Sequence, residues 1–209
     1  MALRLNGSSS GYVELDVPAD AGSHTLTLPD GGGSSGQYLQ TNGSGALSWQ
    51  TVSASNLTRA TAVASTSGTE IAFESLPSGI RRITVMVADL STNGSSEMIV
   101  QLGDSGGYET SGYSSKTLDT GTTLESSSDG FKLSTDMGAT HVYHGAFYID
   151  NIDGNTWVCT GQMSRSDGGN FYRTAGSKAL SAECDRIRLT TQGGSDTFDA
   201  GTVNIMYEV

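Results

Sequence analysis

The chain has 209 residues, enough for one domain of ordinary size with an extended appendage. Its 22 acidic and 11 basic residues give a formal net charge of −11, which repels the phosphate backbone and argues against a nucleic-acid partner. No apolar stretch approaches the roughly 20 residues of a membrane helix, and the first residues lack the apolar region of a signal peptide. We therefore expect a soluble protein, without membrane insertion, that is made in a cytoplasm.

The composition predicts an all-β fold. Glycine is abundant with 28 residues, proline is scarce with 3, and Ser and Thr are frequent, which is typical of short strands joined by tight turns. No stretch combines helical spacing of apolar residues with capping signals at both ends.

Residues 1–60 are expected to form an extended Gly/Ser-rich segment of short strands. Each strand-like fragment has only one or two apolar side chains per face, too few to bury a core alone. The segment must therefore be disordered or pack against copies of itself or another protein, and its alternating patterns and aromatic residues favour association. The expected attachment and trimerisation residues are Leu3, Leu5, Tyr12, Val13, Leu26, Leu28, Tyr38, Leu39, Leu47 and Trp49.

The stretch of small polar residues at about 53–70 is interpreted as the boundary, either a linker or one short helical turn. Residues 61–209 then form the second domain. From Ile71 onward, about nine strand-like runs follow each other with turn chemistry between them. They are IAFESL, RRITVMVADL, EMIVQLGD, FKLST, THVYHGAFYID, TWVCTGQMSR, FYRTAG, DRIRLTT and TVNIMYEV.

Alternation within these runs predicts one core face and one wetter face per strand. Ile83, Val85 and Val87 point to one side, and the last strand repeats the pattern. Asn93-Gly94 and Asp153-Gly154 each lie between two runs and predict β-hairpins. We expect an antiparallel β-sandwich, with jelly-roll topology favoured and a barrel as the alternative.

The sequence Gly103-Asp104-Ser105-Gly106-Gly107 matches the GDSGG motif around the serine of chymotrypsin-like proteases. Those enzymes place their histidine and aspartate before the serine, and the only earlier histidine here is His24, within the N-terminal segment. The motif is therefore interpreted as a turn in which Asp104 and Ser105 form local hydrogen bonds. We expect no enzymatic activity.

Metal and cofactor chemistry finds little support in the sequence. His141 and His144 lie in a strand-like run, where their odd offset places them on opposite faces and favours a structural role over a metal site. Cys159 and Cys184 are expected to act as small buried hydrophobic residues rather than as a disulfide. The acidic turns match no calcium-loop spacing. No cofactor is expected.

Aromatic residues beside glycine-rich loops are candidates for stacking on sugars. These possible glycan contacts are Tyr108, Tyr113, Phe171 and Tyr172. Packing in the rim or core is the alternative interpretation for at least half of them.

Two passages resemble known virion proteins. The run SSGQYLQTNGSGALSWQTV is similar to a segment that recurs in the tail-fibre and related appendage proteins of tailed bacteriophages. The passages PSGIRRITVMVADLSTNGSSEMIVQLGDSGGYETSGY, VYHG and SDTFDAGTVNIMYE resemble a domain found at the ends of many phage fibre-like proteins. The resemblance implies a protein of the virion surface, usually a homotrimer, fixed by its N-terminal end to capsid or tail proteins.

The short slender start differs from the adaptor and repetitive shaft of long tail fibres. A trimeric capsid decoration (cement) protein or short fibre, anchored by the N-terminal segment, is therefore the expected function. The alternative is a tail-fibre receptor-binding protein that recognises host surface carbohydrate with low individual affinity and high avidity.

Overall fold

A computed structural model describes residues 3–15, 19–20, 22–52 and 56–209, with the backbone alone for residues 3 and 13–15. Every regular element in these ranges is a β-strand, which confirms the all-β prediction. The chain divides into two compact units, which we call unit 1 (Met1–Ala54) and unit 2 (Ser55–Val209). Each is described by itself.

Unit 1 contains two separate antiparallel hairpins. In the first, β1 (Leu3–Asn6) pairs with β2 (Tyr12–Leu15). In the second, β3 (Gln37–Thr41) pairs with β4 (Leu47–Thr51), and the side-chain oxygen of Asn42 closes the loop by accepting bonds from two backbone N–H groups. These pairings agree with the expectation of short strands.

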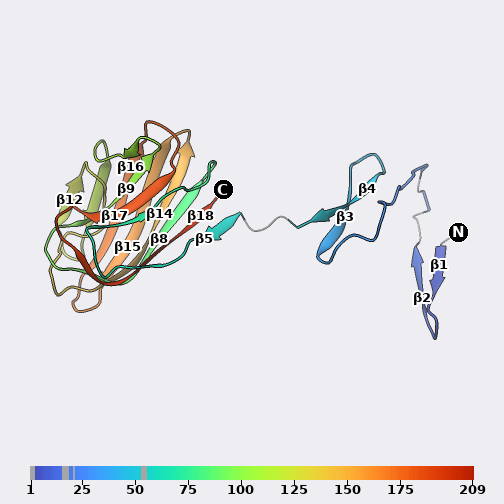
Figure 1. Cartoon of the computed structure of the whole chain (residues 1–209), viewed down its shortest axis with the longest axis horizontal. Helices are drawn as coiled ribbons and strands as arrows, with labels where there is room; N and C mark the ends of the chain where they lie inside the picture. The colour runs from blue at the N-terminus through green and yellow to red at the C-terminus, as the bar shows by residue number, and fades with distance from the viewer. Residues whose placement is uncertain (1–2, 16–18, 21, 53–55) are drawn as a thin grey trace. The chain divides into compact units, whose positions relative to one another are not determined.

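The large sheet of unit 2 has nine strands in the order β12-β11-β16-β15-β14-β8-β18-β5, with β6 also paired to β18 (Figure 1). All of its pairings are antiparallel. Its strands are β5 (Leu57–Arg59), β6 (Val63–Ala64), β8 (Arg82–Thr92), β11 (Ser114–Leu118), β12 (Leu124–Ser127), β14 (Tyr143–Asp153), β15 (Thr156–Arg165), β16 (Phe171–Ala179) and β18 (Phe198–Glu208).

The small sheet has five strands, in which β9 pairs with β17 on one side and with β10 and β13 on the other, and β17 also pairs with β7. These strands are β7 (Glu70–Phe73), β9 (Met98–Asp104), β10 (Gly107–Tyr108), β13 (Phe131–Lys132) and β17 (Arg186–Thr191). The chain passes repeatedly from one sheet to the other, as in jelly rolls.

One buried cluster takes side chains from both sheets, including Leu102 and Leu189 from the small sheet and Phe147 and Ile205 from the large one. Shared burial of this kind makes unit 2 a β-sandwich, as expected. The predicted core face of β8 is confirmed, since Ile83, Val85 and Val87 are buried.

A β-bulge then changes the phase of β8. Asp89 has a positive φ of 54°, and the pairing register shifts on both neighbouring strands, so that Leu90 becomes the next residue to enter the core. Gly201 lies opposite, where a Cβ atom would stand 2.5 Å from the carbonyl oxygen of Asp89. Only glycine fits this approach of two strands.

The two hairpin predictions have different outcomes. Asp153 and Thr156 pair across a two-residue turn between β14 and β15, which confirms the hairpin there. The hairpin predicted at Asn93-Gly94 is wrong, because β8 and β9 belong to different sheets and the turn carries the chain from one to the other. The N–H of Asn93 instead donates to the carbonyl of Thr197, and the side-chain oxygen of Asn93 accepts from the N–H of Thr197.

The boundary at residue 60 also requires correction. The strands β5 and β6 pair with β18, and the hydroxyl of Ser65 donates to the carbonyl of Ala200, so unit 2 begins at Ser55. For the described residues of 53–70, the prediction of a linker or a helical turn is therefore wrong. Strands within this stretch pair with the C-terminal strand β18. Residues 53–55 lie outside the described ranges.

Candidate functional site

The expected attachment residues of unit 1 leave much apolar surface uncovered. Leu26 and Leu28 are 67% and 70% exposed, and Leu5, Tyr12, Tyr38 and Leu39 are exposed as well. Within the described residues, every side chain of the buried hydrophobic core belongs to unit 2. Leu47 and Trp49 are half-buried, so unit 1 leaves most but not all of its described large apolar side chains exposed.

Backbone hydrogen bonds fix the position of the two leucines. The N–H of Thr27 donates to the carbonyl of Gly45 at 2.8 Å, and the N–H of Leu47 donates to the carbonyl of Thr27 at the same distance. This short parallel bridge holds the segment 26–28 against the β3–β4 loop. The bridge joins Thr27 to Ala46, the residue directly before β4.

The β3–β4 hairpin divides the predicted residues between its faces. Leu39 is directly opposite Trp49, and Thr41 is opposite Leu47, so Leu39, Leu47 and Trp49 share a face. Tyr38 lies on the other face, opposite Gln50. The hairpin thus presents apolar groups on both sides.

Trp49 is the best-anchored ring of unit 1. Its indole N–H donates to the carbonyl of Gly31 at 3.0 Å. Gly33 has a φ of 69°, and a Cβ atom there would stand 2.6 Å from the indole ring. The indole ring of Trp49 therefore packs against the segment 31–33, which explains in part why this segment is rich in glycine.

Two predicted attachment residues escape this test. The side chains of Leu3 and Val13 lie outside the described residues, and only their backbones are placed, in β1 and β2.

The expected sugar-stacking set needs correction for two of its four rings. Tyr113 and Tyr172 are only 5% and 0% exposed, because both fill the core, Tyr113 edge-on against Phe131. Tyr108 is half-buried with the guanidinium of Arg188 4.3 Å from its ring centroid. Phe171 lines a groove of unit 2.

That groove lies on the outer face of the large sheet and has a volume of about 640 Å³. Its lining comes from β14, β15 and the start of β16, and includes His144, Tyr148, Thr160, Gln162 and Phe171. Tyr148 is 47% exposed. The groove combines the rings of Tyr148 and Phe171 with amide and hydroxyl groups, and Phe171 is the residue among them that was predicted as a glycan contact.

The GDSGG sequence forms the tight turn between β9 and β10, as interpreted. A side-chain oxygen of Asp104 accepts from the N–H of Gly106 at 2.8 Å, and its other oxygen accepts from the hydroxyl of Ser181 at 2.7 Å. The Ser181 hydroxyl and the Gly106 N–H lower the pKa of Asp104. Both carboxylate oxygens of Asp104 thus form hydrogen bonds that stabilise this turn.

The two histidines of the H-x-x-H sequence have different partners. His141 exchanges a 3.0 Å hydrogen bond with the hydroxyl of Tyr143, whereas His144 accepts from the N–H of Asp89 and lies 3.7 Å from its carboxylate. Within the described ranges, no group of three or more His, Cys, Asp or Glu side chains gathers as a metal site would require.

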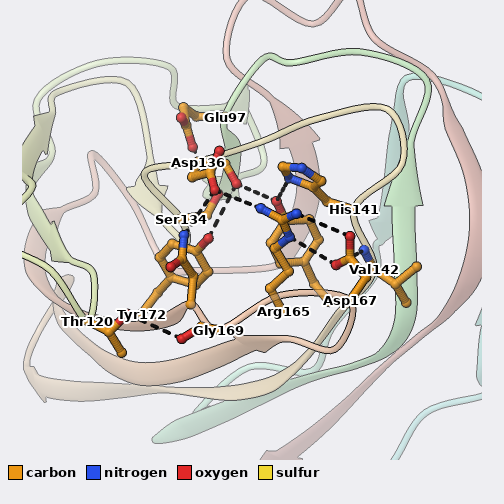
Figure 2. A network of polar contacts seen from close by, with 12 residues as sticks. Glu97, Thr120, Ser134, Asp136, His141, Val142, Arg165, Asp167, Gly169 and Tyr172 are labelled. Atoms are coloured by element: carbon orange, nitrogen blue, oxygen red, sulfur yellow. Dashed lines mark hydrogen bonds and ion pairs between the residues drawn. The ribbon is translucent and has the colours of Figure 1, made fainter.

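A polar network around Arg165 connects two loops of unit 2 (Figure 2). Arg165 donates to Asp136 at 2.9 Å and to both oxygens of Asp167 at 2.9 and 3.3 Å. Asn170 donates to the same oxygen of Asp136 at 3.0 Å, and the hydroxyl of Tyr143 donates to the Asp136 carbonyl. The Arg165 hydrogen bond lowers the pKa of Asp167.

These contacts have a structural consequence. Both carboxylates are engaged by the guanidinium, and the two tyrosine hydroxyls that reach the Asp136 carbonyl are attached to buried rings, Tyr143 and Tyr172. The network therefore fixes the loop after β13 to the end of β15 and to the turn that follows it.

Glu97 stands beside this network and behaves differently (Figure 2). Burial raises its pKa to about 7, although the donated hydroxyl of Ser134 and the charge of Lys132 oppose the shift. A carboxyl whose pKa is raised on folding stabilises the fold below its ordinary value of 4.5, and this stabilisation is lost as the pH rises through about 7.

We expect Glu97→Gln to abolish this pH dependence. At pH 8 the variant should exceed the native chain by about 1 kcal/mol in free energy of unfolding, discounted for the partial exposure of the carboxyl, and at pH 4 the two should agree. Urea unfolding at both pH values measures the difference. The exposed Asp199→Asn is the control for loss of one negative charge, and an equal gain from it would contradict the explanation.

Both cysteines are buried and free, as expected. Burial raises the pKa of the Cys159 thiol to about 12 and that of Cys184 to about 11. Since the thiolate is the reactive form, we expect neither to react with a disulfide reagent at pH 8 until the chain unfolds. The number of thiols that react is measured by absorbance with and without denaturant. Rapid reaction of the native chain would refute the expected protection of both cysteines.

Comparison with protein-family models and with curated proteins found no match to this chain. No helix long and apolar enough to span a membrane occurs among the residues that the structure describes.

Proposed function

We propose that this chain is a structural protein on the surface of a tailed-phage virion, a trimeric capsid decoration or short-fibre protein. Unit 1 attaches it to capsid or tail proteins, and unit 2 is displayed. The observation that carries the proposal is the exposed apolar surface of unit 1, represented by Leu26 and Leu28.

Physical reasoning connects this surface to attachment. Fully burying a leucine is worth about 1.5–3 kcal/mol, so hairpins that leave several large apolar groups exposed gain by covering them with another surface. Hairpins of two strands are marginal alone, and their free edges are also available for pairing. Unit 2, by contrast, has its own core. The proposal thus gives each unit a separate role.

The resemblance of the β3–β4 region and of unit 2 to phage appendage proteins supports the proposal that the particle is a phage virion. The acidic chain, with its net charge of −11, is also suited to a surface that must remain soluble at high copy number.

Removal of unit 1 tests the proposal. We expect residues 55–209 to fold, because the core is contained in them, and to be missing from particles assembled in their presence. Circular dichroism checks the fold, and gel analysis of purified particles measures incorporation. Incorporation of the truncated chain at the level of the full chain would refute attachment through unit 1.

The receptor-binding alternative has less support from the rings first assigned to it, since two of them are buried. The outer groove of the large sheet is the location that would remain for a glycan.

A further inference from the structure

Two adjacent rows of side chains cross the outer face of the large sheet. One runs from Leu124 on β12 through Ala146 on β14 to Asn204 on β18. The next runs from Ser126 through Tyr148 to Arg59 on β5. We call these two rows the outer strip. The groove described above opens onto it.

The outer strip differs in charge from the chain as a whole. Its three charged residues, Arg59, Lys116 and Arg173, are all basic, and all 22 acidic residues of the chain lie elsewhere. The next row toward one end carries Asp150 and Glu208, and Arg82 between them lies 2.6 Å from the carboxylate of Asp150 and 3.9 Å from that of Glu208. The strip therefore contains basic and uncharged residues but no carboxylate, on a protein whose net charge is −11.

We propose that the outer strip is a contact surface between copies of this chain, deepening the proposed function by naming where the trimer forms. An acidic chain repels its own copies over most of its surface, and a band without carboxylates removes that repulsion. The apolar groups that a contact would cover are also present, as in the exposed Tyr148 and Leu118 and the half-buried Met86.

Charge also determines how the copies meet. Two strips placed face to face would bring basic groups together, whereas the strip of one copy on an acidic surface of the next is complementary. Such a contact joins different surfaces of the two copies, and this type of contact closes into rings such as a trimer.

The outer strip supplies part of such a contact. Eight adjacent strands span roughly 34 Å at about 4.8 Å per spacing, and the two rows of the strip cover roughly 13 Å along the strands. The resulting band of roughly 450 Å² is about half of the 800 Å² or so per partner in a standard interface, so flanking residues must complete the contact.

Sedimentation of the full chain tests the proposal with two pairs of variants. Arg173→Glu and Tyr148→Ser change the strip, while Arg81→Glu makes the same charge reversal and Ile152→Ser removes a large apolar side chain at exposed positions outside it. We expect each strip variant to weaken association at least tenfold and each control to leave it unchanged. Raising the salt concentration should weaken association of the native chain.

Three results would overturn the proposal. They are a native chain that stays monomeric, strip variants that associate like the native chain, and a native monomer that binds host surface polysaccharide and loses this binding in Tyr148→Ser. The last result would assign the face to a glycan. The proposed function is tested separately. It fails if the chain is absent from purified particles, whether or not its copies associate with each other.

Discussion

Particles assembled with the Leu26→Ser/Leu28→Ser double variant should carry at least about tenfold fewer copies of the chain than particles assembled with the native chain. Burial of each leucine contributes about 2 kcal/mol, and every 1.4 kcal/mol changes an affinity tenfold. Both side chains are exposed in unit 1, so the substitutions remove no packing within the chain. Gel quantitation of purified particles measures the copies.

A matched pair of substitutions in unit 2 controls for the loss of apolar surface. Ile152→Ser/Val209→Ser changes two exposed apolar residues of unit 2 in the same way. We expect this control to be incorporated normally. Equal losses in both variants would show that attachment does not depend on unit 1.

Gly161→Ala should destabilise unit 2 by about 3 kcal/mol, because the added methyl group overpacks the core. Gly161 on β15 is directly opposite Phe147 on β14, whose ring lies over it. A Cβ atom at Gly161 would stand 2.2 Å from the ring and 2.7 Å from the Cα atom of Phe147. The backbone atom cannot move aside as a side chain can. We expect a fall of roughly 10 °C in Tm.

Gly169→Ala is the matched control, since nothing lies within 4 Å of a Cβ atom there. Its free energy of unfolding should stay within about 0.5 kcal/mol of the native value. Thermal and urea unfolding of both variants provide the comparison. A Gly161→Ala chain as stable as the control would contradict the described packing of β14 on β15.

The strands of unit 2 were predictable where apolar residues define them. Each of the nine runs named from Ile71 onward overlaps a strand of the structure, since alternation and strand-forming residues are local properties of the sequence. The sandwich followed from their number and their one-sided patterns.

The strands β11 and β12 were missed because polar residues occupy their inward positions. Ser115 accepts a hydrogen bond from the N–H of Lys132 at 3.0 Å, and Thr117 donates to the Lys132 carbonyl at 2.6 Å. These hydroxyls are satisfied by the backbone of β13, a partner that a pattern of apolar residues does not reveal.

Long-range pairing limited the other predictions. The turn chemistry of Asn93-Gly94 is local, but the sheet that the chain enters afterwards depends on distant partners of β9. The Arg165 network joins residues from separate loops, and the outer strip exists only once strand order and register are known. Exposure of the leucines in unit 1 followed from the scarcity of apolar residues around them.

Quantitation of this chain in purified phage particles tests the proposed virion location most directly. Gel densitometry against a known structural protein gives the number of copies per particle. The account predicts a particle-bound chain in a multiple of three, with hundreds of copies for a capsid decoration protein and a few trimers for a short fibre. A chain found only in the soluble fraction of the lysate, and absent from intact particles, would contradict the account.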